Sequence, residues 1–145
     1  MVLIELGLIG IILLGFMAFA QTEPDYSNPY APIFTDKEVY TWTDKMKITI
    51  VAPSWNANKY GIDSIGTQEG HLIKISTSDN ELEPYKLTET DLSSGTFTGE
   101  VILTGFLHDV DGDGRFDTTP RTLGNGPTSG FLETERDGGI TISFE

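Results

Sequence analysis

Apolar and polar residues alternate along most of this chain from about residue 35 onward, and a period of two restricts it to β-structure. The pattern occurs in five stretches, at residues 46–52, 73–76, 85–88, 97–104 and 140–144. Alternation of this kind indicates strands that bury one face and expose the other. No window from residue 21 onward has a convincing helical period, so we predict an all-β domain.

Two further stretches, residues 38–42 and 130–135, have strand composition and raise the expected number of strands to about seven. Residues suited to tight turns stand at 43–44, 93–95 and 137–139. Short strands at this spacing are typical of a β-sandwich. We therefore predict a β-sandwich over residues 35–145, preceded by an extended, proline-containing linker at 21–34 and an apolar segment at 1–20.

Charge and cysteine content limit the partners and sites that this chain can have. Its 145 residues carry a formal net charge of −13 and include no cysteine. Nucleic acids and anionic membrane surfaces are therefore poor partners, whereas cations or basic surfaces suit the charge. The absence of cysteine excludes a disulfide framework, a thiolate metal site and a cysteine nucleophile.

Residues 109–117 contain four aspartates at alternating positions, a pattern that suits a hard cation. Calcium takes six to eight oxygen ligands, and a short loop supplies them from positions 1, 3, 5, 7 and 9. Gly114 stands at the sixth position, where a sharp turn is needed. The expected calcium ligands are Asp109, Asp111, Asp113, the Arg115 carbonyl and Asp117.

The loop departs from an EF-hand, because Pro120 stands where a bidentate glutamate would close the site and the flanking residues are poor helix formers. We expect a loop between strands, with the missing ligand from water or from Glu133 or Asp137. Weak affinity, about 0.1 to 1 mM, would follow. The alternative interpretation is a solvated acidic turn held by hydrogen bonds from its own aspartates.

No constellation for catalysis stands out, so we expect a protein that is not an enzyme. His71 and His108 are the only histidines, and no Gly-x-Ser-x-Gly motif accompanies them. Trp55 lies in an expected loop and has two interpretations. It either provides a binding surface, for carbohydrate stacking or a subunit contact, or caps one end of the sandwich core.

Residues 1–20 form an almost unbroken apolar run that ends in Ala18-Phe19-Ala20. An export signal cleaved after Ala20 fits this ending, and a retained membrane-anchor helix is the second possibility. A third follows from a resemblance. The residues Met1-Val2-Leu3-Ile4-Glu5-Leu6 resemble the mature N-terminus of type IV pilins, whose fifth-position glutamate pairs with a neighbouring subunit's terminal amine. All three place the remainder of the chain outside the cytoplasm.

Several segments of residues 35–145 share their pattern with one kind of domain. They are residues 39–45, 48–53, 56, 88–90, 94–101, 109–119, 130–132 and 139–144. They resemble the Ig-like modules of archaeal cell-surface and S-layer proteins, closest to those of ammonia-oxidising archaea. The run Ser94-Gly95-Thr96-Phe97-Thr98-Gly99 is the most specific part. The resemblance implies an Ig-like β-sandwich that serves as an extracellular structural or adhesive module, often strung in series.

Together these observations predict a secreted or cell-surface module stiffened by bound calcium, whose partners are other surface subunits or copies of itself. The alternative function is a pilin-like filament subunit, with the helix of residues 1–20 packed in the filament core.

Overall fold

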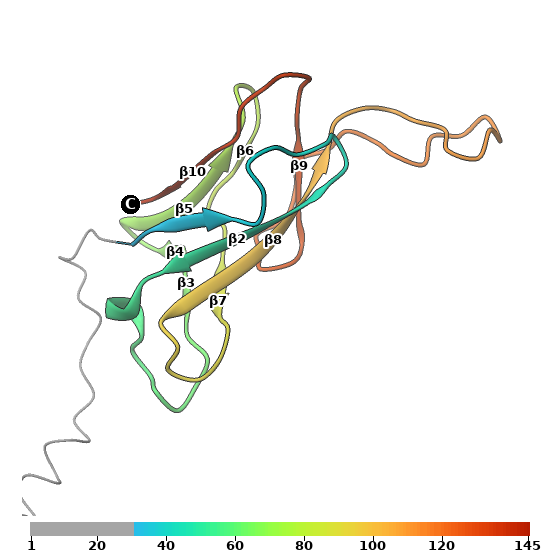
Figure 1. Ribbon diagram of the computed structural model, residues 1–145. Helices are drawn as coiled ribbons and strands as arrows, with labels where there is room; N and C mark the ends of the chain where they lie inside the picture. The colour runs from blue at the N-terminus through green and yellow to red at the C-terminus, as the bar shows by residue number, and fades with distance from the viewer. Residues whose placement is uncertain (1–30) are drawn as a thin grey trace, which may run out of the picture.

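The computed structural model of the chain describes residues 31–145, which form an all-β domain of two sheets arranged as a sandwich (Figure 1). The sheets enclose a core of buried apolar side chains contributed by both. The β-sandwich expected from the alternating sequence is confirmed at this level. The expected apolar helix at residues 1–20, and most of the expected linker, lie outside the described residues.

The first sheet is centred on the antiparallel pair β2 (Lys45–Val51) and β8 (Thr96–Thr104). Strand β1 (Ile33–Thr35) pairs with the outer edge of β2. On the other side of β8, its first half pairs with β7 (Leu87–Glu89), and β7 pairs with β3 (Ser64–Ile65). The second half of β8 pairs with β9 (Gly130–Glu133), and this pair is parallel.

The second sheet is built around β5 (His71–Ser76). Strand β10 (Thr141–Phe144) runs antiparallel along one edge of β5. The other edge of β5 pairs with β4 (Thr67–Gln68) and then with β6 (Glu81–Leu82). The only helical element among the described residues is the short 3₁₀ turn η1 (Pro53–Trp55), so this part of the chain holds no helix that could cross a bilayer.

In the central strands, the alternation of apolar and polar residues matches the alternation of buried and outward-facing side chains. In β2, Met46, Ile48 and Ile50 are at most 1% exposed, while the residues between them face outward or are half-buried. Strand β8 buries Phe97 and Val101 in the same way. Each such side chain contributes about 1.5–3 kcal/mol when it leaves water. The central strands therefore account for much of the stability of the domain.

Strand β8 changes partner near Gly99, and this glycine allows the change. A Cβ atom there would lie 3.1 Å from both the Leu87 side chain and the Pro127 carbonyl, tighter than ordinary contact. Close by, the fully buried Tyr85 donates its hydroxyl to the Glu100 carbonyl at 2.5 Å and accepts from Gly130 N–H at 3.1 Å. Burial raises the pKa of Tyr85 to about 12, so the hydroxyl stays protonated and ties β8 to the start of β9.

The structure corrects some expected strands. Residues 38–42 are a loop, because the Tyr40 hydroxyl accepts from Lys37 N–H and the Asp44 carboxylate accepts from Thr41 N–H, which closes turns in place of a ladder. Strands β1, β3, β4 and β6 were not predicted, since two or three residues are too few for alternation to show. Strand β1 begins at Ile33, inside the range 21–34 expected to be a linker.

Candidate metal site in the β8–β9 arm

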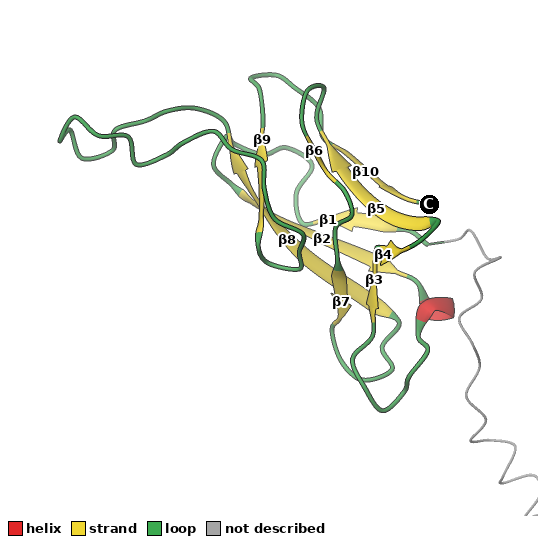
Figure 2. Ribbon diagram, turned by 180° about the vertical axis from the view of Figure 1, so that it is seen from behind, coloured by secondary structure: helices red, strands yellow, loops and turns green. Residues whose placement is uncertain are grey.

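The first part of the connection between β8 and β9, about residues 105–120, extends away from the sandwich as a long arm (Figures 1 and 2). Residues 121–129 return along the sheet, where Leu123 pairs with Phe131 and the Pro127 carbonyl accepts from Glu100 N–H. The base of the arm is held by an edge-to-face contact between Trp42 and Phe106, with ring centroids 4.8 Å apart. Farther out, the Thr118 hydroxyl donates to the Phe106 carbonyl at 2.9 Å, and Asp117 N–H donates to the His108 carbonyl at 2.8 Å. The aspartate loop, residues 109–117, lies beyond these ties and forms the arm tip, which lies between strands as predicted.

The arm tip brings three of the four predicted aspartates together. One carboxylate oxygen each of Asp109, Asp111 and Asp117 lies within 4.8 Å of the others. Asp109 is half-buried and the other two are exposed. Because a calcium–oxygen distance is about 2.3–2.6 Å, oxygens about 5 Å apart can share one ion. This cluster of three carboxylates could therefore hold a metal ion.

The same aspartates also accept hydrogen bonds from the backbone of the tip. Asp109 accepts from Gly112 N–H at 2.6 Å and from Gly114 N–H at 2.8 Å, and Asp117 accepts from Val110 N–H at 2.7 Å. Both glycines have positive φ, 77° and 85°, as a tight loop requires. These are the bonds that the alternative interpretation, an acidic turn, predicts. An ionised carboxylate has about four acceptor sites, so the bonds leave lone pairs for a cation.

Hydrogen bonding also affects the charge state of Asp109. The bond from Gly114 N–H, with smaller contributions from Gly112 and other neighbours, lowers the pKa of Asp109 below its ordinary value of 3.8. Asp109 is therefore ionised at neutral pH, and its charge is available to a cation.

The remaining predicted ligands are Asp113 and the Arg115 carbonyl, and the latter stays a prediction. Asp113 is not part of the three-carboxylate group, and its Oδ1 accepts from Arg115 N–H at 2.8 Å. Neither Glu133 nor Asp137, each considered as a source of the missing ligand, belongs to the group. Any further oxygen ligands would have to come from the loop carbonyls or from water.

The hypothesis that Trp55 stacks on a carbohydrate is wrong. Trp55 is 6% exposed, and its ring packs 5.1 Å from the His71 ring and 5.0 Å from the Phe144 ring, measured between centroids. It caps one end of the core, which was the other interpretation of this residue. The second histidine, His108, lies at the arm with its ring 5.4 Å from that of Phe106.

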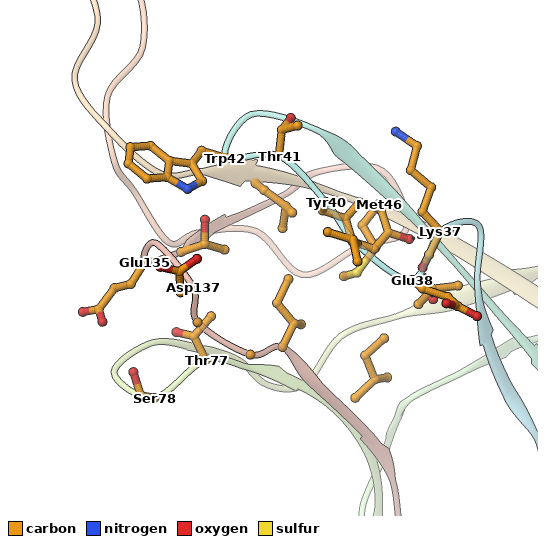
Figure 3. A pocket seen from close by; sticks show the side chains of 18 residues that line it. Lys37, Glu38, Tyr40, Thr41, Trp42, Met46, Thr77, Ser78, Glu135 and Asp137 are labelled. Atoms are coloured by element: carbon orange, nitrogen blue, oxygen red, sulfur yellow. Dashed lines mark hydrogen bonds between the residues drawn. The ribbon is translucent and has the colours of Figure 1, made fainter.

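A further candidate site, which we call the end pocket, was not predicted from the sequence. It has a volume of about 510 Å³ and lies where loop 37–42, the turn at 77–78 and residues 134–142 meet at one end of the sandwich (Figure 3). Trp42 lies on one side of it, opposite Thr77 and Ser78. The sequence predicts a strand at 38–42, and a strand there would leave no loop to line a pocket. The pocket was therefore not predicted.

Comparison with models of known protein families finds no match, and comparison with curated proteins finds no significant relative. The function proposed below therefore depends on the geometry and the sequence of this chain itself.

Proposed function

We propose that this chain is an extracellular cell-surface module, structural or adhesive and without catalytic activity, whose arm is stiffened by a bound calcium ion. The observation that supports the proposal most directly is the group of Asp109, Asp111 and Asp117 at the tip of a protruding arm. The two-sheet fold and the resemblance of residues 35–145 to the Ig-like modules of archaeal surface proteins support the same function.

Calcium is the favoured ion because all available ligands are hard oxygen atoms in a flexible loop. Calcium tolerates irregular coordination by six to eight oxygens, whereas magnesium demands near-ideal octahedral geometry. Three carboxylates also repel one another at this separation, and a divalent cation would relieve the repulsion. Carboxylate, carbonyl and water ligands disfavour the softer transition metals.

The expected effect of the ion is mechanical. The arm tip exposes apolar residues, with Val110 and Phe116 more than 60% exposed, so little burial holds it in place. Ligand binding stabilises a folded state by RT ln(1 + [L]/Kd). At about 1 mM calcium and a dissociation constant of about 0.1 to 1 mM, this gives about 0.4–1.4 kcal/mol, confined to the arm and its base.

Calcium titration of the protein, followed by amide hydrogen exchange, tests the proposal. We expect calcium to slow exchange about twofold to tenfold at residues 110–117, corresponding to about 0.4–1.4 kcal/mol, and to leave the core strands unchanged. Asp111→Asn with Asp117→Asn should abolish the effect. The control is Glu69→Gln with Asp91→Asn, which removes the same charge from exposed positions away from the arm. Equal exchange in calcium and in chelator would exclude a calcium site in the tip.

The alternative function, a pilin-like filament subunit, is favoured by one feature, the glutamate at position 5 of the apolar run. The two functions differ in the fate of residues 1–20. N-terminal sequencing of the exported protein should begin at Gln21 for the surface module and at or near Met1 for the filament subunit.

A further inference from the structure

The end pocket has an apolar floor that opens onto the core. Met46 and Leu103, both at most 2% exposed, contribute to this floor together with Ile142 of β10. Tyr40 and Trp42 form its aromatic side. A volume of about 510 Å³ falls in the range of pockets that bind small molecules or side chains of a partner.

The aromatic side is fixed before any ligand arrives. The Tyr40 hydroxyl donates to an Asp36 carboxylate oxygen at 2.6 Å and accepts from Lys37 N–H at 3.0 Å. Trp42 is held by its edge-to-face contact with Phe106. Gly105 leaves space for this contact, since a Cβ atom there would collide with Trp42. A pre-formed side reduces the ordering cost of binding.

The rim of the pocket is acidic. Glu135 and Asp137 lie on one side and Glu38 on the opposite side (Figure 3). Lys37 is the only basic residue among those that line the pocket, and its Nζ is already 3.2 Å from an Asp44 carboxylate oxygen. The rim therefore presents an excess of negative charge around an apolar floor.

The charges on one side of the rim favour a positively charged ligand. A hydrogen bond with Asp79 and the charge of that residue, with a smaller effect of Glu133, raise the pKa of Glu135, because carboxylates crowd this side of the rim. A ligand that brings positive charge would relieve this crowding.

We propose that the end pocket docks an extended segment of another protein in which lysine or arginine adjoins an aromatic or branched apolar residue. The apolar side chain enters between Tyr40, Trp42 and Met46, and the basic side chain meets the rim carboxylates. The outer edge of β10 pairs with no strand among the described residues, so the backbone of the segment can add to that edge.

Charge favours a basic partner over two other candidate occupants of the end pocket, the N-terminal residues of this chain and a second copy of it. Residues 1–30 of this chain contain Glu5, Glu23 and Asp25 but no lysine or arginine, so they do not complement the rim. A second copy brings a net charge of −13 and is repelled at long range. A basic segment is attracted by the same field, which speeds its association.

The test uses the full chain and an acetylated, amidated probe peptide, Ser-Lys-Phe-Lys-Val-Ser, with tryptophan fluorescence and calorimetry as readouts. We expect saturable binding with a shift in emission that the Trp42→Phe variant loses, since Trp55 is buried at 6% exposure and distant from the pocket lining. Replacing both lysines of the peptide with glutamate should weaken binding at least tenfold. Replacing its phenylalanine with serine should do the same.

Protein variants complete the test. Glu135→Gln with Asp137→Asn should weaken peptide binding at least tenfold, and Glu69→Gln with Asp91→Asn, which removes the same charge elsewhere, should leave it within twofold. Equal binding of the lysine and glutamate peptides would overturn the proposal. So would an emission shift that survives in Trp42→Phe, or self-association that the peptide displaces, which would assign the pocket to a second copy.

Discussion

The segments before and after the long strand β8 are both ordered by carboxylates that accept backbone N–H groups, but in opposite surroundings. At the start of β8, Glu89 is 5% exposed, and its two oxygens accept from Gly95 N–H at 2.9 Å and from Asp63 N–H at 3.0 Å. At the far end, Asp109 and Asp117 accept similar bonds in a tip whose neighbouring Val110 and Phe116 are exposed.

The difference lies in what covers the bonds. At the start of β8, Gly95 lies against η1: its carbonyl accepts from Ala52 N–H at 2.8 Å, and a Cβ atom there would collide with Pro53. Trp55 belongs to the same turn and is 6% exposed. Water is excluded, so the bonds to Glu89 gain strength from a low dielectric. The arm tip has no such cover, and we therefore expect its order to depend on an ion.

The largest effect should come from removing the cover at the start of β8. Trp55→Ala deletes a ring that contacts His71 and Phe144 and should destabilise the domain by about 3–5 kcal/mol. Urea denaturation measures the loss. The control is Tyr60→Ala, because Tyr60 is 71% exposed and should cost less than about 0.5 kcal/mol. Similar losses in both variants would show that Trp55 is no structural cap.

A direct comparison of the two carboxylate networks should give the next largest effect. Glu89→Gln replaces an acceptor oxygen with an NH₂ group that faces a backbone N–H donor. Because both groups are then buried without partners, the free energy of unfolding should fall by about 2 kcal/mol. Asp111→Asn, made in the exposed tip and measured in chelator, should cost less than about 0.5 kcal/mol. Thermal unfolding of both variants checks the ranking. If the two variants lose equal stability, burial does not separate the networks.

The sequence was sufficient to predict the central strands and the position of the acidic loop, for a physical reason. Alternation over six or more residues, as in β2 and β8, reflects one buried face and needs no knowledge of the partner strand. The loop at 109–117 was visible because its glycines and aspartates act locally, within a few bonds of one another.

What escaped prediction depends on contacts between distant residues. Strand β9 pairs in parallel with β8 because Tyr85, from a third segment, bonds both Glu100 and Gly130. The end pocket likewise joins loop 37–42 to residues 134–142. Trp55 had two interpretations in the sequence, and only the positions of His71 and Phe144 decide between them.

The smallest expected effect is the response of the arm tip to acid, which tests the tip separately from the rest of the domain. The pKa of Asp109 is lowered in the folded protein, so its bonds to Gly114 and Gly112 contribute fully above the unfolded value of about 3.8. That contribution is lost as the pH falls through the lower, folded pKa. The amide chemical shifts of both glycines, followed by NMR without calcium as the pH is lowered, should therefore change with a midpoint below 3.8.

Calcium should sharpen this result, because protons and the ion compete for the same oxygens. In calcium the midpoint for Gly112 and Gly114 should move to still lower pH, while the amide of Gly95, bonded to the buried Glu89, should not respond to the ion. A midpoint at or above 3.8 without calcium would mean that the backbone bonds do not hold the Asp109 carboxylate. A midpoint that calcium leaves in place would mean that the ion binds elsewhere, and the tip would then resemble the start of β8 in being ordered by its own hydrogen bonds.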